Sequence, residues 1–405
     1  MKKVLLLLVL GFVVLATGEV FADTVRALSI GAPIALVDDT FIINSFSSRL
    51  VNFPSSVFFG VSGATGNVTM FPGIALRLSD SFSLMYIYDQ PDGSFGTVIP
   101  AALVIRTGLV GNEILHSPLN LWAGLKMGGM SLGVFYRLSY YDVTSTEGLN
   151  TNTAIVNDKD YGSYYVHTLS PSLTFMLDDK ASAFDIAVNI GLQSLNNFEE
   201  DPAATNIVSV PGIRNIGVVA QLTMQMSPEF RLAFRLNANN QNNSFDDYTV
   251  LSGSNTTNSK LLQHINTLGL TVGLKYQIVP AIAVYFDLIG QLSQTYNGAT
   301  ISDTLTLPPS NNFGAEWIID AWAFRVGMNT RYMLTTVNTI VDGRISAKSY
   351  SSSISYSPFL GIGYKALPWA INFIIDAQIF TKTVAMINTG AGFSPIVRFQ
   401  LNYVF

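Results

Sequence analysis

The chain has 405 residues, of which 49% are hydrophobic and 12% aromatic, and its formal net charge is −5. Asp, Glu, Lys and Arg together make up 12%, against roughly 25% in ordinary globular domains. This composition argues against a typical soluble enzyme, and the acidic balance argues against nucleic-acid binding. The chain has no cysteine, which excludes disulfides and attachment as a lipoprotein.

The first 22 residues have the pattern of a secretory signal peptide. Lys2 and Lys3 precede an apolar run over 4–16, and Val20-Phe21-Ala22 offers small residues where a signal peptidase reads. We therefore predict that the protein is exported and that cleavage follows Ala22.

The remaining chain is apolar enough for a membrane, yet it contains no run of about 18 apolar residues that could span one as a helix. Backbone groups in lipid must be paired within the protein, so the spanning structure that remains is a closed β-barrel. We therefore predict an all-β protein, a transmembrane antiparallel β-barrel in the bacterial outer membrane.

The last ten residues alternate as a strand with one apolar and one polar face. Arg398, Gln400 and Asn402 share the polar face, because a side chain changes face at every step of a strand. The apolar face ends on an aromatic residue, which resembles the closing strand that the outer-membrane assembly machinery recognises. The expected assembly signal consists of Phe399, Leu401, Tyr403 and Phe405.

Strand patterns between these ends are joined by short turns and long polar segments in alternation, which is typical of outer-membrane barrels. The expected long loops are 142–163, 194–212, 240–261, 293–311, 336–349 and 381–391. Counting strands back from the terminus gives fourteen, or sixteen if 57–63 and 67–78 join the wall. Both numbers are even, as expected for a single-chain bacterial barrel.

Charged side chains keep to one parity along the predicted strands. A charge facing the middle of the bilayer costs about 2–4 kcal/mol for Arg or Lys, so we assign the charged parity to the lumen. The lumen-facing set is Arg137, Asp185, Arg231, Arg235, Lys275, Asp287, Arg325, Arg331, Asp376 and Arg398. Seven of these are basic and three acidic, which predicts a positively charged lumen.

Residues 23–56 do not share the alternation. The run from Arg26 to Thr40 is rich in small residues and includes Gly31-Ala32-Pro33 and Val37-Asp38-Asp39. It resembles the start of mature proteins in the outer-membrane long-chain fatty-acid transporter (FadL-like) superfamily, although Phe46-Ser47-Ser48 stands where the family has Asn-Pro-Ala. The resemblance implies a hatch inside the barrel and passage of hydrophobic compounds. The expected hatch residues are Arg26, Gly31, Asp38 and Asp39, and the expected divisions are 1–22, 23–56 and 57–405.

Nothing in the sequence forms a catalytic or metal-binding constellation, so we expect no enzyme, no cofactor and no metal. His116, His167 and His264 are far apart and are interpreted as polar residues near strand ends. The glycine-rich run 60–66 lacks the lysine and following helix of a phosphate-binding loop. A Ser/His lipid hydrolase has no supporting pattern around these histidines.

Three functions remain open: passive passage of small, hydrophobic molecules past a hatch, a general diffusion porin, and a structural or partner-binding barrel. The lumen arginines fit an anion-favouring pore or a clamp for the carboxylate of a fatty-acid-like substrate. They also fit a plugged barrel in which they pair with aspartates and hatch residues such as Asp38 and Asp39, because charges inside a plugged barrel must be paired or hydrated. The expected partners are the lipid bilayer, the barrel-assembly machinery and a small-molecule substrate.

Overall fold

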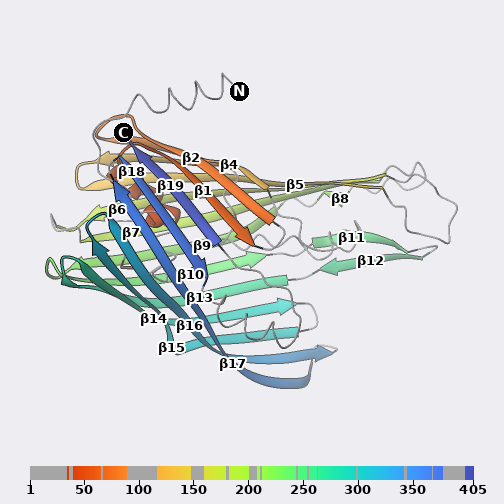
Figure 1. Ribbon diagram of the computed structural model, residues 1–405. Coiled ribbons are helices and arrows are strands. Elements are labelled where there is room, and N and C mark those ends of the chain that lie inside the picture. Colours follow the sequence, from red (N-terminus) through yellow and green to blue (C-terminus); the bar gives the residue numbers. More distant parts are fainter. Residues whose placement is uncertain are drawn as a thin grey trace, which may run out of the picture.

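The computed structural model describes most of the strands and part of the segment before them (Figure 1). The described residues are 34–35, 40–64, 67–88, 116–146, 159–178, 182–199, 208–209, 212–242, 245–252, 255–261, 263–297, 300–341, 344–366, 368–376 and 397–405. Within them, no helix is long and apolar enough to cross a bilayer.

Two short 3-10 helices precede the strands, η1 (Thr40–Asn44) and η2 (Ser47–Asn52). The strands are β1 (Ser56–Ala64), β2 (Asn67–Arg77), β3 (Phe82–Ile87), β4 (His116–Met127), β5 (Met130–Thr146), β6 (Lys159–Met176), β7 (Ala183–Glu199), β8 (Val208–Ser209), β9 (Gly212–Gln225), β10 (Phe230–Asn242), β11 (Phe245–Ser252), β12 (Asn255–Leu261), β13 (Gln263–Val279), β14 (Ile282–Asn297), β15 (Thr300–Ile319), β16 (Trp322–Val341), β17 (Arg344–Ala366), β18 (Trp369–Asp376) and β19 (Val397–Val404).

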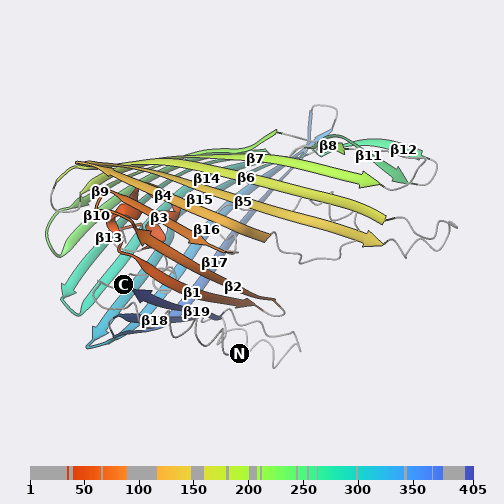
Figure 2. The same cartoon turned by 90° about the horizontal axis from the view of Figure 1, so that it is seen from above.

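These strands form a closed antiparallel barrel, as the sequence predicts. Consecutive strands pair around the wall, and β1 pairs with both β2 and β19, from Ser56 opposite Val404 to Gly63 opposite Val397. The short β8 pairs with the end of β7, while β11 and β12 form a separate hairpin. Without these three, sixteen strands close the barrel, the larger of the two expected numbers, because β1 and β2 both belong to the wall (Figures 1 and 2).

Tight turns gather at the end of the barrel that also holds the C-terminus (Figure 1). Gly128 and Gly129 join β4 to β5, and Gly128 adopts a φ of 60°, which glycine tolerates best. The expected long loops at 293–311 and 336–349 are wrong, because β14–β15 and β16–β17 continue there as paired strands. These segments are polar but rich in Thr, Ser, Val and Ile, and their β-branched side chains favour strands.

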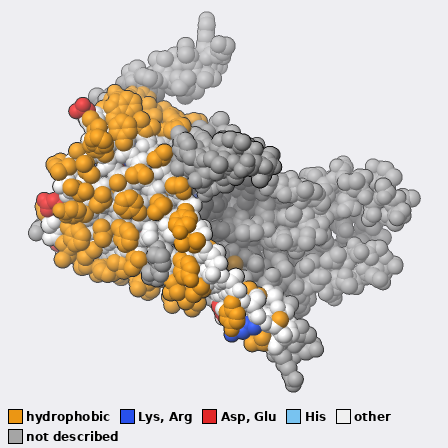
Figure 3. All heavy atoms as spheres, turned by 60° about the horizontal axis from the view of Figure 1, so that its bottom comes forward, with side chains coloured by type: hydrophobic (Ala, Val, Ile, Leu, Met, Phe, Trp, Pro, Cys, Tyr) orange, Lys and Arg blue, Asp and Glu red, His pale blue; other side chains and the backbone are white. Residues whose placement is uncertain are grey.

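The outer surface carries the apolar parity. On β10, Phe234 and Leu236 are exposed, while Ala233, which has the opposite parity, is fully buried. Figure 3 shows hydrophobic side chains covering the described part of one face. Aromatic rings collect beside the tight turns: Trp322 lies 4.7 Å from Tyr364, and Trp369 lies 4.4 Å from Tyr403, between ring centroids. This arrangement matches the aromatic girdle of a membrane barrel.

The segment before β1 folds against the inner side of this wall. Its helix η2 contacts β3, β4, β5 and β6. Wall glycines make room for it: Gly124 and Gly133 face each other in the β4–β5 register, and a Cβ at Gly133 would overlap the backbone of Ser47 and Ser48. A Cβ at Gly124 would come within 2.9 Å of Val51 Cγ1. The pair is a notch in the wall shaped for the helix.

Replacing Gly133 with Val should therefore dislodge η2 while the barrel still forms. Overpacking of this kind costs about 1–3 kcal/mol. Arg49 is 4% exposed in η2, so trypsin should cleave after it in the variant and spare it in the original protein. The control is Gly129→Ala in the turn, where an added Cβ meets no atom within 4 Å. Equal protection of Arg49 in both variants would show that the notch does not hold the helix.

Candidate functional site

The candidate site is the contact between the barrel wall and the hatch, which we define as residues 23–56. The predicted hatch residues Arg26, Gly31, Asp38 and Asp39 lie outside the described residues. The described hatch consists of Ile34, Ala35 and the stretch from 40 to 56. Two sets of contacts that include hydrogen bonds anchor it to the wall, one formed by η2 and one by Ile34-Ala35.

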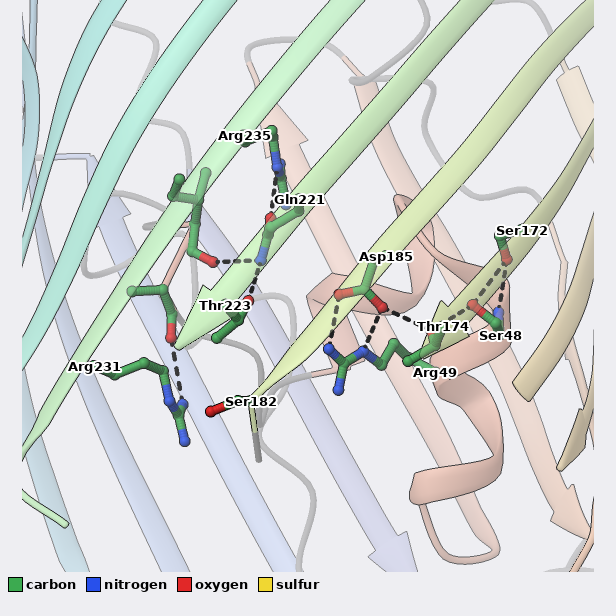
Figure 4. Close-up of polar contacts among 12 residues, drawn as sticks. Ser48, Arg49, Ser172, Thr174, Ser182, Asp185, Gln221, Thr223, Arg231 and Arg235 are labelled. Atoms are coloured by element: carbon green, nitrogen blue, oxygen red, sulfur yellow. Dashed lines mark hydrogen bonds and ion pairs between the residues drawn. The ribbon is translucent and has the colours of Figure 1, made fainter. Parts of the chain in front are cut away.

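The first anchor is a buried ion pair between η2 and β7 (Figure 4). Arg49 donates from Nε to Asp185 Oδ1 at 2.8 Å and from Nη2 to Oδ2 at 2.7 Å. Thr174 on β6 donates a third hydrogen bond to Asp185 Oδ1 at 2.6 Å. The two charged side chains are 5% and 0% exposed. A bidentate pair with its remaining lone pairs used is the arrangement that makes a buried charge tolerable.

Hydroxyl groups extend this anchor along β6. The Ser172 hydroxyl accepts the backbone N–H of Ser48 at 2.8 Å and lies 2.8 Å from the Ser47 hydroxyl. The Ser48 hydroxyl lies 2.8 Å from Thr174 Oγ1. All four side chains are buried. Inward-facing Ser and Thr on β6 therefore satisfy the polar groups at the start of η2, which has no side-chain cap of its own.

The second anchor lies on another part of the wall and holds the hatch backbone. The Ile34 N–H donates to Asp287 Oδ2 on β14 at 3.0 Å, and Gln221 on β9 donates to the Ile34 carbonyl at 3.1 Å. Arg231 on β10 donates to the Ala35 carbonyl at 3.4 Å. Ile34 and Ala35 pack against Ala233, so the turn is buried as well as hydrogen-bonded.

Two further arginines border this second anchor. Arg235 donates to Gln221 Oε1 at 2.8 Å, and its guanidinium lies 5.7 Å from the ring centroid of Phe46, a cation–π contact. Arg331 donates to Asn312 Oδ1 at 3.0 Å, and Asn312 in turn donates to Asp287 Oδ2 at 3.1 Å. Among the described residues, no carboxylate forms an ion pair with either arginine.

Of the remaining residues predicted to face the lumen, the structure describes the side chains of three. Arg325 is buried and donates to Glu316 at 2.7 Å and to Asn372 at 2.6 Å. Arg137 is buried and donates to Asn120 at 2.6 Å. Lys275 is half-buried, opposite Arg231 in the β10–β13 register. The side chains of Asp376 and Arg398 lie outside the description.

These contacts favour one of the two interpretations of the lumen charges. Each described lumen arginine is hydrogen-bonded, mostly to amide or carbonyl groups and in two cases to a carboxylate. Such contacts stiffen a plugged barrel, because each of these arginines donates to a group within the protein. In the described part of the chain, no group of three His, Asp or Glu side chains could hold a metal ion.

Several site residues are not among those predicted. Arg49 was missed because its partner Asp185 is 136 residues away, and no local pattern relates them. Gln221, Ser172 and Thr174 are uncharged, so the parity of the charged residues does not point to them. Glu316 could have been predicted from the sequence, because the tight turn between β15 and β16 places it directly opposite Arg325.

The expected assembly signal lies on the outward parity of β19. Phe399, Leu401 and Tyr403 share this face and lie opposite Val61, Phe59 and Val57 of β1, in that order. Val404 points the other way and is fully buried in the interior apolar cluster. Recognition of this strand and of Phe405 by assembly machinery stays a prediction.

Comparison with solved structures finds outer-membrane barrels. The toluene transporter TodX of Pseudomonas putida is 11% identical with a TM-score of 0.41, and the match covers 95% of this chain and 97% of TodX. The toluene transporter TbuX of Ralstonia pickettii is 11% identical with a TM-score of 0.42, covering 96% and 99%. A FadL homologue of Pseudomonas aeruginosa is 8% identical with a TM-score of 0.44, covering 96% and 100%. No family model and no curated protein matches the sequence.

Breaking the first anchor should destabilise the hatch in a way that depends on which charge remains. Arg49→Ala or Asp185→Ala alone leaves an uncompensated buried charge, which costs about 3–5 kcal/mol. The pair Arg49→Met with Asp185→Leu should be much milder, because no charge is left buried. Urea unfolding in lipid vesicles measures the effect. Arg77→Ala, which breaks the exposed contact with Asp80, is the control and should change little. An equal loss of unfolding free energy in the single and the double variants would contradict an ion pair that anchors the hatch.

Proposed function

We propose that this protein is a passive channel for small hydrophobic molecules in the bacterial outer membrane, closed by its hatch. The observation that carries the proposal is the two-sided hatch. One side is polar and bonded to β6 and β7, and the other is apolar and packed on the wall. A plug with no transport role has no need of an apolar path behind it.

The apolar side forms a continuous cluster inside the barrel. Hatch residues Ile42, Ile43, Phe46, Leu50 and Phe53 belong to it and are all buried. The wall contributes Ala75, Met85, Ile87, Trp122, Phe135, Ala187 and Val404, with Trp122 stacked on Phe135 at 4.5 Å between ring centroids. If the hatch moves away, these wall residues line the inside of the barrel. An apolar lining favours a hydrophobic solute over an ion or a sugar.

A general diffusion porin is the less favoured alternative, because η1, η2 and Ile34-Ala35 occupy the interior between the two anchored parts of the wall. A structural barrel has a specific observation in its favour, the buried Arg49–Asp185 pair with the glycine notch. Movement of the hatch separates the two: transport requires it, and a structural plug does not.

The proposal also includes how the channel reaches the outer membrane and what surrounds it there. Residues 1–22 would direct export, the lipid bilayer of the outer membrane would surround the apolar outer face, and the barrel-assembly machinery would act on the strand that ends at Phe405. We propose no catalytic role, because the polar interior residues bond to one another and to the hatch.

Single-channel conductance of the mature protein in planar bilayers tests whether the hatch closes the pore. We expect a closed intact barrel and a large, steady conductance after deletion of residues 23–50, because both anchors leave with the deletion. A steady large conductance in the intact protein would show a porin. Closure in both forms would contradict a hatch that blocks the lumen.

A disulfide between hatch and wall tests whether the hatch must move. The chain has no cysteine, and the Ser47 and Ser172 hydroxyl oxygens lie 2.8 Å apart, so Ser47→Cys with Ser172→Cys should form a bond on oxidation. We expect the oxidised protein to lose at least ten-fold in uptake of toluene or decanoate into vesicles, and reduction to restore it.

The matched control for the disulfide between hatch and wall is a second disulfide within the wall, made by Thr267→Cys with Ser293→Cys. The hydroxyl groups of these two residues lie 3.5 Å apart on β13 and β14. That bond leaves the hatch free, so oxidation should not change uptake. Uptake that persists with the hatch locked would favour a path elsewhere, and no uptake in any form would favour the structural barrel.

A further inference from the structure

The outer face of the barrel has a hollow of about 430 Å³ across β2, β3, β4 and β5. Its lining is almost wholly apolar, and much of it comes from outward-facing residues in two rows of strand partners. Leu84, Ala123 and Val134 are neighbours in the row nearer the tight turns. Tyr86, Leu121 and Tyr136 are neighbours in the row beyond it.

Ala123 explains why the wall is hollowed here. It stands between Leu84 and Val134 in the register, where its neighbours are larger and are exposed at the surface. A single methyl group at the centre of a ring of long side chains leaves a depression. Because the depression is continuous with the apolar outer band, it faces acyl chains when the barrel is in a bilayer.

A polar pair borders the hollow on the side away from the tight turns. The Tyr136 hydroxyl lies 2.9 Å from Nδ1 of His167, an exposed residue on β6. If the tyrosine donates, the ring proton of a neutral His167 is on Nε2. If the histidine donates, the tyrosine O–H remains. In either tautomer the pair keeps one donor for an outside acceptor.

The height of His167 places this donor near the edge of the apolar band. Phe175 to His167 spans eight residues, which is about 26 Å along the strand and about 20 Å along an axis tilted by roughly 40°. The apolar band of such barrels is about 25 Å tall. The outward side chains between them, Leu173, Pro171 and Leu169, are apolar. His167 therefore lies near the level of lipid headgroups on the long-loop side.

We propose that the hollow and the Tyr136–His167 pair form a binding site for one membrane lipid with a phosphate headgroup. One acyl chain lies over Ala123 between the two rows, and the phosphate accepts a hydrogen bond from the pair. A lipid is the occupant because the lining is apolar, faces the bilayer and has its donor at headgroup height. The site is on the outside of the wall, so it does not depend on the function proposed for the lumen.

Native mass spectrometry of the mature protein in dodecyl maltoside tests the site with dimyristoyl phosphatidic acid, dimyristoylglycerol and inorganic phosphate as probes. We expect the first bound lipid to be phosphatidic acid with at least five-fold tighter binding than dimyristoylglycerol, which has the same acyl chains and no phosphate. Ala123→Phe, which fills the hollow, should weaken both lipids at least five-fold. Tyr136→Phe with His167→Leu, which removes both donors of the pair, should weaken phosphatidic acid alone, to the level of dimyristoylglycerol.

Two matched controls separate this site from lipid that coats the whole barrel. Ala315→Phe fills an outward position between Val284 and Val326 on another part of the wall, and His264→Leu removes a histidine paired with Tyr296. Neither should change the first binding step. The proposal is overturned if Ala315→Phe weakens binding as much as Ala123→Phe, or if phosphatidic acid binds the Tyr136→Phe/His167→Leu variant and the original protein alike. Binding of inorganic phosphate at this pair without lipid would also overturn it.

Discussion

The pairing of β1 with β19 is the constraint on which the rest of the structure depends. In a bilayer each unpaired backbone group costs several kcal/mol, so a sheet can span only if its two edges meet. The register from Ser56–Val404 to Gly63–Val397 provides that meeting. Closure also fixes which parity of every strand faces lipid. Arg137, Asp185 and Arg325 therefore lie inside, whereas Phe234 and Leu236 lie outside.

Closure with sixteen strands creates the need for a hatch. A barrel of about eight strands is filled by its own side chains, whereas one of about sixteen encloses a channel. The inner wall here carries apolar residues such as Trp122 and Phe135 on one side and charges such as Asp185 and Asp287 on another. The hatch has an apolar and a polar side that match these two sides of the wall. Phe46 and Leu50 belong to the apolar cluster, and Arg49 forms an ion pair with Asp185.

The sequence supports the class of fold and the lumen parity because both follow from local alternation. Two expectations failed where composition misleads. Polar 293–311 and 336–349 suggested loops, yet their hydroxyl and β-branched side chains pair across strands, as Thr304 does with Thr335 at 3.2 Å. The two anchors could not be found, because each joins the hatch to strands 120 or more residues away. Asp185, Asp287 and Arg231 were expected in the lumen, but no local pattern relates them to Arg49 or to the backbone of Ile34-Ala35.

The two anchors differ in kind, and the difference decides which part of the hatch can move at lower cost. Ile34-Ala35 is held through its backbone by Asp287, Gln221 and Arg231, and hydrogen bonds of this sort contribute about 0.5–1.5 kcal/mol each, or about 1.5–3 where a charged group takes part. Leaving Arg49 or Asp185 buried without its partner costs about 3–5 kcal/mol, and releasing η2 also breaks its contacts with the hydroxyl groups of Ser172 and Thr174. A solute that competes for the wall near Arg231 and Arg235 therefore meets the anchor with fewer contacts first, and release of η2 from its glycine notch follows as the costlier step.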